Sequence, residues 1–280
     1  MTTAHMSRSP DLVLEDRHFR ILQKVIADET GILVNEEKRC LLQARLAARL
    51  RHLGLTSMED FVDRVVSGGQ RCDRNTLISA VTTNVTSFFR ENHHFKLLSE
   101  RILPPRLAGL KDNGRIRIWS AACSTGEEAY SIAATIHQLC PDAGNRDIRV
   151  LATDIDPEVL QVAHRGAYAA DRIAALQPLQ RAALFGDTGG GEIRSELRQL
   201  LRFRLLNLNG DWPMRGPFDV IFCRNAAIYF PRDLQERLWQ RLAALLQPGG
   251  WLILGHSERL MGETARAFAC EDITAYRKLE

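Results

Sequence analysis

The chain has 280 residues, of which 45% are apolar and 25% charged, as in ordinary soluble globular proteins. This length is enough for two domains with buried cores. No apolar run reaches the roughly 18–20 residues that a membrane span requires, which argues against direct membrane insertion. Residues 1–10 are polar and lack the apolar segment of a secretory signal, so we expect a cytoplasmic protein. The net charge of +3 does not by itself indicate a partner.

Up to about residue 115 the apolar residues recur with helical spacing. After residues 1–14, which we expect to be flexible, the pattern predicts helices over 16–31, 35–53, 58–66 and 74–81. These form an N-terminal helical domain over 15–90, followed by a linker helix over 91–114. In the second helix, Leu42, Leu46, Leu50 and Leu53 mark the apolar face.

A basic stripe lies on another face of that second helix. It consists of Lys38, Arg45 and Arg49, with His52. The stripe is either a solvated polar face or a surface that binds an acidic partner.

From residue 115 onward, apolar runs of strand length alternate with helical stretches. Strands are predicted at 116–121, 148–153, 218–223 and 251–255, with one or two closing strands over 268–278. Helices are predicted at 127–139 and after Pro157. Parallel strands need crossover connections, so the alternation predicts a mostly parallel sheet with helices on both faces, over 115–280. A Gly-rich turn at 186–191 between β-like pieces predicts a small antiparallel β insert at about 177–205.

Small residues follow the first predicted strand and lead into a helix at Gly126. In an open α/β sheet the carboxyl ends of the strands are where ligands bind, and small side chains let the backbone approach them. Glu127 and Glu128 at the helix start argue against a bound pyrophosphate, and they suit a positively charged group such as the amino group of a methionine moiety. The alternative is a plain turn with capping carboxylates.

Polar residues also follow the later strands. Asp154, at the tip of the second strand, is placed to accept hydrogen bonds from two ribose hydroxyls, whereas Asp156 can cap the helix at Pro157. The alternative assigns both carboxylates to capping. Asn207 and Leu208 can read and stack on an adenine, or form an ordinary turn. Further candidates at a carboxyl end are Arg224, Asn225 and Tyr229.

Taken together, the motifs resemble the family of chemoreceptor glutamate methyltransferases (CheR). They are the runs 82–91 (TTNVTSFFRE) with His93, His94 and Phe95, then 119–128 (WSAACSTGEE), 153–156 (TDID), 222–225 (FCRN), 228–230 (IYF) and 255–258 (GHSE). The resemblance covers about residues 15–280. It implies a class I S-adenosylmethionine-dependent methyltransferase fold (Rossmann-like) with an N-terminal all-helical domain and a small β-subdomain.

The resemblance also implies an activity, a cofactor and site residues. The expected activity is methyl esterification of specific glutamates on chemoreceptors (methyl-accepting chemotaxis proteins), which resets receptor sensitivity during adaptation. The enzyme would be cytoplasmic and recruited to membrane receptor arrays. Residues assigned to S-adenosylmethionine, whose product is S-adenosylhomocysteine, are Asn84, Thr86, Arg90, Glu128, Asp154, Asn207, Leu208, Arg224 and Asn225. Arg90 and Tyr229 would lie closest to the transferred methyl.

The nucleophile would be a glutamate carboxylate, which is ionised at neutral pH because its ordinary pKa is about 4.3. No general base is therefore required. We expect no metal, since His93 and His94 lack a third ligand at suitable spacing and are better explained by packing at a helix start. The six cysteines form no CxxC pair.

The sequence disfavours two other functions. A nucleic-acid methyltransferase is disfavoured because residues 224–227 contain no proline pair and no basic patch is interleaved with aromatic residues. A cofactor-sensing module with a dead site is disfavoured by the intact set from Asn84 to Tyr229. The expected partner is therefore the receptor's methylation helices, which the basic stripe Lys38, Arg45 and Arg49 would bind, and not nucleic acid.

Some members of the family grip a pentapeptide at the receptor's C-terminus through a long loop of the β-subdomain. Here the turn is short and built on glycines 189–191, which offer few side chains to anchor a peptide. We therefore expect no pentapeptide tether. The alternative is that an open sheet edge in the insert is enough to bind one.

Overall fold

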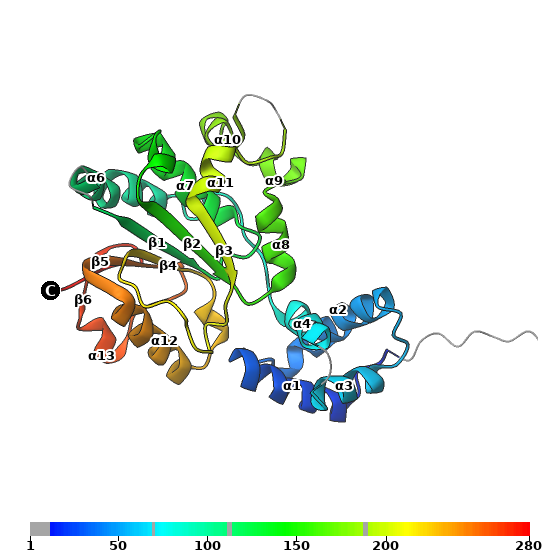
Figure 1. Ribbon diagram of the computed structural model, residues 1–280. Coiled ribbons are helices and arrows are strands. Elements are labelled where there is room, and N and C mark those ends of the chain that lie inside the picture. The colour runs from blue at the N-terminus through cyan, green and yellow to red at the C-terminus, as the bar shows by residue number, and fades with distance from the viewer. Residues whose placement is uncertain (1–11, 69–70, 111–113, 187–189) are drawn as a thin grey trace, which may run out of the picture. The chain divides into compact units, whose positions relative to one another are not determined.

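The structure, a computed structural model, describes residues 12–68, 71–110, 114–186 and 190–280. The chain divides into two compact units between Thr83 and Asn84. Figure 1 shows a helical first unit in blue and cyan, and a second unit that contains the sheet. Within the described ranges, none of the helices has the length and apolar character that crossing a membrane requires.

The first unit packs its helices around one apolar core. Phe19, Leu46 and Phe61 are completely buried there. Helix α1 ends at Gly31, whose φ of 76° gives the left-handed cap that glycine adopts without strain. The helices are α1 (Asp16–Thr30), the 3-10 helix η1 (Glu36–Lys38), α2 (Arg39–His52), α3 (Met58–Val66) and α4 (Arg71–Val81).

The predicted helices of this unit are confirmed, with two differences in detail. Leu53 is exposed, because α2 ends at His52 before the apolar stripe is complete. Residues 12–14 are not a flexible end: Leu12 and Leu14 are buried in the core, since their apolar side chains cover the helices. Residues 1–11 of the predicted flexible segment lie outside the described ranges.

The second unit contains a seven-stranded sheet in the order β3-β2-β1-β4-β5-β7-β6. The first five strands in this order are parallel, and β7 and β6 pair antiparallel at one edge, so the predicted mostly parallel sheet and closing strands are confirmed. The strands are β1 (Ile116–Ala121), β2 (Ile148–Asp154), β3 (Leu201–Leu205), β4 (Phe218–Cys223), β5 (Leu246–Leu254), β6 (Phe268–Asp272) and β7 (Ala275–Lys278).

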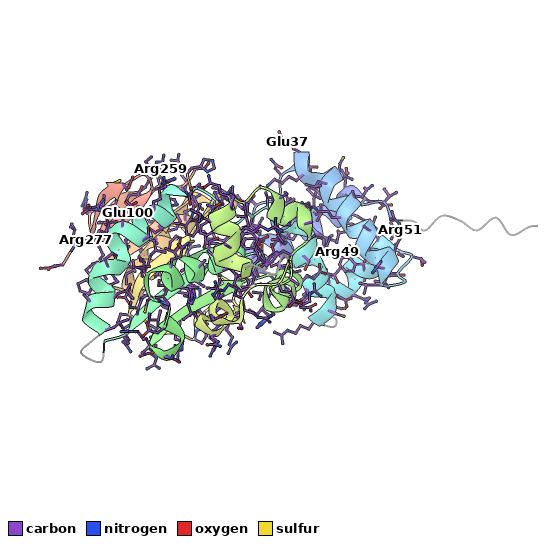
Figure 2. All side chains as sticks on the ribbon, turned by 90° about the horizontal axis from the view of Figure 1, so that it is seen from above. Glu37, Arg49, Arg51, Glu100, Arg259 and Arg277 are labelled. Carbon is purple, nitrogen blue, oxygen red and sulfur yellow. The ribbon has the colours of Figure 1, made fainter. Side chains whose placement is uncertain are left out.

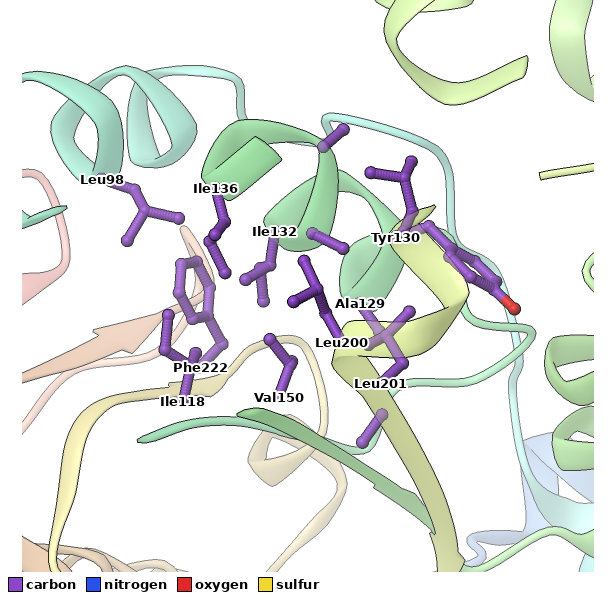
Figure 3. Close-up of a cluster of buried hydrophobic side chains, with 14 of the residues drawn as sticks. Leu98, Ile118, Ala129, Tyr130, Ile132, Ile136, Val150, Leu200, Leu201 and Phe222 are labelled. Carbon is purple, nitrogen blue, oxygen red and sulfur yellow. The ribbon is translucent and has the colours of Figure 1, made fainter. Parts of the chain in front are cut away.

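Helices cover both faces of the sheet, and each face has its own apolar core. In Figure 3, Ile132 and Ile136 of α7 (Glu127–Leu139) point toward Ile118, Val150 and Phe222 of the strands. Trp239 of α12 (Arg232–Leu245) is buried against the opposite face. The other helices are α5 (His93–Leu97), the π-helix η2 (Leu98–Ile102), α6 (Leu103–Gly109), η4 (Ala143–Asn145), α8 (Pro157–Arg165), α9 (Ala170–Ala174), α10 (Pro178–Phe185), α11 (Ser195–Leu200), η6 (Ala227–Tyr229) and α13 (Gly262–Ala265).

The predicted domain boundary differs from the observed one. Residues 84–90 belong to the second unit, although we expected the helical domain to reach residue 90. The predicted linker over 91–114 is part of the same unit, because Phe95, Leu98 and Ile102 are buried in the core beneath α7. These apolar side chains are buried in the core of the sheet unit itself.

The segment 177–205 does not form the predicted antiparallel insert. Its described residues fold as α10, α11 and β3, and β3 runs parallel to β2. Pro178 at the first helical position and the Gln180 side chain, which accepts from the Gln177 backbone N–H at 3.2 Å, start α10 instead. Antiparallel pairing between this segment and the preceding loop is limited, in the described part, to the bridge Ala167–Glu192. Residues 187–189 of the glycine turn lie outside the described ranges.

Candidate functional site

Six of the predicted cofactor residues lie at or just after the carboxyl ends of four neighbouring parallel strands: Glu128, Asp154, Asn207, Leu208, Arg224 and Asn225. In the register of the sheet, Ala121 at the end of β1 lies beside Thr153 of β2 and Cys223 of β4. Asp154 at the end of β2 lies beside Leu205 of β3. The loops after these strands therefore meet at one edge, around the point where the strand order reverses, which is where open α/β sheets bind ligands.

The loop after β1 has an unusual backbone. Ala122, Ser124 and Gly126 have φ values of 61°, 50° and 96°, in the left-handed region. A Cβ added at Gly126 would lie 2.9 Å from the Ala163 Cβ, so a larger residue would push α8 away. Strained backbone of this kind occurs at ligand-binding turns that the surroundings hold in place.

Two aspartates hold this loop against the end of β2. Asp154 Oδ2 accepts from the Ser124 N–H at 2.8 Å, and Oδ1 accepts from the Asp156 N–H at 2.9 Å. Burial raises the pKa of Asp154 to about 6. Asp156 caps α8 through the Glu158 N–H at 2.9 Å and accepts from Asn84 Nδ2 at 2.8 Å. The predicted capping role of Asp156 is confirmed.

Asn84 and Thr86 belong to the segment that leads from the end of the first unit to the site. Besides its bond to Asp156, Asn84 accepts through its carbonyl from the Ser124 hydroxyl at 3.1 Å. The Thr86 carbonyl accepts from Arg172 Nη1 at 3.1 Å. Both residues are half-buried beside the loop after β1.

Arg224 is a buried cation that joins three segments of the site. Its Nη1 donates to Glu128 Oε2 at 3.0 Å, and its Nη2 donates to the Arg90 carbonyl at 2.6 Å. The same Nη2 lies 3.4 Å from Glu91 Oε1. The side chain of Arg224 is only 2% exposed, so these two carboxylates balance a charge that is almost fully shielded from water.

Glu127 and Glu128 face different partners. Glu128 accepts from the Ser120 hydroxyl at 2.7 Å as well as from Arg224. Glu127 accepts from Thr125 at 2.6 Å and pairs with Arg172 at 3.3 Å. Burial raises the pKa of both carboxyl groups above its ordinary value. Glu128 is the one that belongs to the Arg224 cluster.

Arg90 lies in a turn whose flanking residues, Phe89 and Glu91, both have positive φ (51° and 56°). Its Nη1 donates to the Val85 carbonyl at 2.9 Å. The side chain is half-buried, and four further N–H donors of a guanidinium remain besides the one in this bond. The turn thus presents Arg90 beside the Arg224 cluster.

Asn207 and Leu208 follow β3, next to Asp154. The Leu206 N–H donates to the Asp154 carbonyl at 2.9 Å, which ties this loop to β2. Asn207 Oδ1 accepts from the Asn209 N–H at 2.9 Å, as in an Asx turn. Leu208 is buried in the core on the α12 side of the sheet.

The loop after β4 carries Asn225 and Tyr229, and Glu258 holds it in shape. Glu258 Oε2 accepts from the N–H groups of Asn225 and Gly255 at 2.7 and 2.8 Å. Its Oε1 accepts from Ala226 and Ala227 at 3.1 and 2.8 Å. These bonds support Asn225 at a φ of 58° and place η6, with half-buried Tyr229, at the same edge.

Glu258 belongs to the motif 255–258, but the sequence alone assigns no role to it. The sequence indicates a structural role only indirectly, because Glu258 stands three residues after the glycine that follows a strand. A Cβ at Gly255 would lie 2.5 Å from Asn225 Nδ2 and 2.8 Å from Glu258 Oε2, so only glycine fits there. Ser124 and Glu91 are further contact residues that the sequence alone did not single out.

The basic stripe lies in the first unit, and its residues have different surroundings. Arg45 Nη1 donates to the carbonyls of Thr82 and Ala80 at 2.9 and 3.2 Å, beyond the end of α4 and in its last turn. Its guanidinium therefore has a structural role. Lys38 and Arg49 are half-buried, and Arg51 is exposed. Figure 2 labels Arg49 and Arg51 among the side chains of this unit.

The contacts of Glu258 generate a testable prediction. Glu258→Gln keeps the length of the side chain but replaces one acceptor oxygen by an NH2 group, which faces N–H donors. Leaving buried donors unsatisfied costs about 1–3 kcal/mol, so we expect the free energy of unfolding of the second unit to fall by about this amount. All four tryptophans, at 119, 212, 239 and 251, lie in this unit, so urea unfolding followed by tryptophan fluorescence measures it selectively.

Glu263→Gln is the matched control, because Glu263 is exposed in α13. Its effect should stay within about 0.5 kcal/mol. Equal stability of Glu258→Gln and the wild type would show that the carboxylate does not hold the loop.

Comparison with known proteins places both units in one family. The description "CheR methyltransferase, all-alpha domain" matches residues 17–82, and "CheR methyltransferase, SAM binding domain" matches residues 84–277. The chain is 42% identical over 258 residues to the probable chemotaxis protein methyltransferase of Rhizobium etli, covering 90% of this chain and 96% of that protein. It is 38% identical over 282 residues to the chemotaxis protein methyltransferase of Escherichia coli K12, covering 98% and 95%. The chain therefore belongs to the CheR family of chemotaxis methyltransferases, and its second unit is the S-adenosylmethionine-binding domain of that family.

Proposed function

We propose that this protein transfers the methyl group of S-adenosylmethionine to the side-chain carboxylates of specific glutamates on chemoreceptors. The observation that supports this most directly is the meeting of Asp154, Glu128 and Arg224 at the carboxyl edge of the sheet. Family membership supports the cofactor and the chemotaxis role, and the names of the relatives support a methyltransferase. The substrate would be the receptor's cytoplasmic methylation helices.

The donor set at this edge suits the chemistry of the cofactor. A carboxylate has about four acceptor positions, and hydrogen bonds to Ser124 and Asp156 occupy two of those on Asp154. The remaining positions would accept from the two ribose hydroxyls. Glu128 and Arg224 would bind the amino and carboxylate groups of the methionine end. Asn207 and Leu208, tied to β2 beside Asp154, would contact the adenine. Asn84, Thr86 and Asn225 would complete the pocket.

When bound, S-adenosylmethionine supplies an electrophilic methyl group on a sulfonium. The chain's own residues need only orient the incoming carboxylate and exclude water, because an ionised glutamate requires no base. Correct orientation alone can contribute about 7–11 kcal/mol to lowering the barrier. Arg90 and Tyr229 would provide it, with Arg90 positioned by the turn at residues 89–91. A loose contact with Arg90 serves this better than a tight ion pair, which would weaken the nucleophile.

Transfer of labelled methyl groups tests the proposal. The protein is incubated with labelled S-adenosylmethionine and membranes from a chemotactic bacterium, with RNA as the alternative acceptor. We expect label on the receptor band, released as methanol by mild alkali because a glutamyl methyl ester hydrolyses there. Label on RNA, or alkali-stable label on protein, would contradict the proposed esterification. Cofactor binding without transfer to either acceptor would favour a sensing module.

Asp154 provides a prediction about cofactor binding. Asp154→Ala should lower the affinity for S-adenosylhomocysteine at least tenfold, or about 1.4 kcal/mol, through the lost hydrogen bonds to the ribose. The ionised carboxylate is the better acceptor. Because the pKa of Asp154 is about 6, wild-type affinity should rise as the pH increases through 6. Calorimetric titrations between pH 5 and 8 measure both effects.

Two variants separate this role from others. Asp154→Asn should lose the pH dependence, since an amide does not titrate, whereas Asp171→Asn on the exposed surface of α9 should behave as the wild type. If Asp154→Ala bound the product with wild-type affinity, Asp154 would have no part in holding the ribose.

We further propose that the basic stripe, Lys38, Arg45 and Arg49, attracts the receptor. The methylation helices of the family's substrates are acidic, and charged surfaces steer association most strongly at low salt. The bonds of Arg45 to the Ala80 and Thr82 carbonyls make it unsuitable for charge reversal. Lys38 and Arg49 are the other two residues of the stripe, and the test below changes them.

The double variant Lys38→Glu with Arg49→Glu should methylate receptor membranes more slowly than the wild type. Its rate should depend less on salt, while its affinity for S-adenosylhomocysteine stays the same. Initial rates at several salt concentrations measure this, with Lys24→Glu on the exposed side of α1 as the control. Equal rates for the double variant and the control would show that the stripe is a solvated surface that does not bind the receptor.

The third proposal concerns tethering. Apart from the edge of β3 in the main sheet, pairing of the segment 177–205 with the preceding loop is limited, among described residues, to the Ala167–Glu192 bridge, so the segment offers no antiparallel hairpin to which a peptide could add. We therefore expect no measurable binding of a pentapeptide that ends in an aromatic residue when it is titrated into the protein. A peptide of scrambled sequence controls for non-specific binding. Micromolar affinity for the first peptide alone would make this segment a receptor tether.

A further inference from the structure

Three ligand-type atoms converge in the turn that leads into α5. Glu91, His93 and His94 each offer one ligand atom, and these three atoms lie within 4.8 Å of one another. Each of the three residues also has a buried side-chain atom (Glu91 Oε2, His93 Nε2 and His94 Nδ1) without a hydrogen-bond partner among the residues that the structure describes. Buried polar atoms are rarely left unsatisfied, so three of them in one cluster indicate that something else binds there.

The hydrogen bonds of His94 show which form of the ring faces this point. Its Nε2 lies 3.0 Å from the Ile273 carbonyl, which can only accept, so Nε2 carries the proton. In the neutral ring Nδ1 then has a free lone pair, directed to Glu91 Oε2 at 3.7 Å. Two acceptors cannot bond to each other. An imidazole fixed by a backbone carbonyl through its other nitrogen is the arrangement typical of metal-ligating histidines.

Glu91 is shared between this point and the Arg224 cluster. Its Oε1 faces Arg224 Nη2 at 3.4 Å and His256 Nδ1 at 3.2 Å, whereas Oε2 faces the histidines. The positive charge of Arg224 is also balanced by Glu128 at 3.0 Å, so it does not fully neutralise Glu91. The carboxylate retains negative charge for a second cation on its other side.

We propose that Glu91, His93 and His94 bind a divalent transition metal, with Zn²⁺ as the best match to two imidazole nitrogens and one carboxylate oxygen. In a tetrahedral zinc site the ligand atoms lie about 3.3 Å apart, so the side chains would close by up to about 1.5 Å. A water molecule would take the fourth position. The metal would tie the turn after Arg90 to the Ile273–Thr274 loop. This inference goes beyond the proposed function, since carboxylate methylation itself requires no metal.

A titration of the full-length protein, freed of metal by a chelator, tests the site. We expect one Zn²⁺ per chain with micromolar or tighter affinity, and an increase in the thermal midpoint as Zn²⁺ is added. Co²⁺ in place of Zn²⁺ should give the visible absorption of a tetrahedral site with nitrogen and oxygen ligands. The Co²⁺ spectrum uses the unmodified chain, so it does not depend on how well any variant folds.

Variants locate the metal. His93→Ala and Glu91→Gln should weaken binding at least tenfold, whereas His52→Ala, in an exposed position at the end of α2, should leave it unchanged. His93 is only half-buried, and tryptophan fluorescence verifies that its variant is folded. Absence of stoichiometric binding at 100 µM Zn²⁺ would mean that a water molecule satisfies the three atoms, and it would overturn the proposal. Unchanged affinity in His93→Ala and Glu91→Gln would overturn it too.

Discussion

The ion pair between Arg224 and Glu128 is the contact on which the arrangement of the site depends. It joins the loop after β4 to the start of α7, while the same guanidinium binds the carbonyl of Arg90 and pairs with Glu91. A guanidinium this deeply buried is stable only if its partners are in place. The three segments therefore have to assemble together. The cofactor site proposed above includes this cluster.

Two other buried carboxylates stabilise the site through backbone N–H groups. Asp154 accepts from Ser124 and Asp156, and Glu258 accepts from four residues around the loop after β4. Loops with positive φ at Ala122, Ser124 and Asn225 are costly on their own, and these bonds compensate for that cost. Preorganised loops lose little conformational freedom when a ligand binds. The raised pKa of Asp154 follows from the same burial that makes it an effective anchor.

The sequence was misleading where local patterns were ambiguous. Leu184 and Phe185 look like strand residues beside a glycine-rich turn. They are instead the buried residues of α10, a helix that begins at Pro178 and packs on the α7 side of the sheet. The strand at Leu201–Leu205 lies within the predicted insert, but it pairs in parallel with β2. A short apolar run has the same sequence pattern in a parallel and in an antiparallel strand. The direction of pairing is decided by partner strands far along the chain. The sequence likewise indicates no third ligand beside His93 and His94. The carboxylate of Glu91 reaches them only through the turn in which Glu91 has a positive φ.

By itself, the sequence determined the alternation of strands and helices, the helical first unit, the resemblance to the family and the loops that carry Asp154, Glu128 and Arg224. Those features rest on periodicity, caps and motifs, which neighbouring residues encode. Only the tertiary structure decided that Arg45 binds the carbonyls of Ala80 and Thr82, that Glu258 supports the loop at Asn225, and that residues 84–110 belong to the second unit. Each of these depends on contacts between residues that are distant in the chain or on a turn whose shape the surroundings impose. Local sequence patterns carry no signal for such contacts.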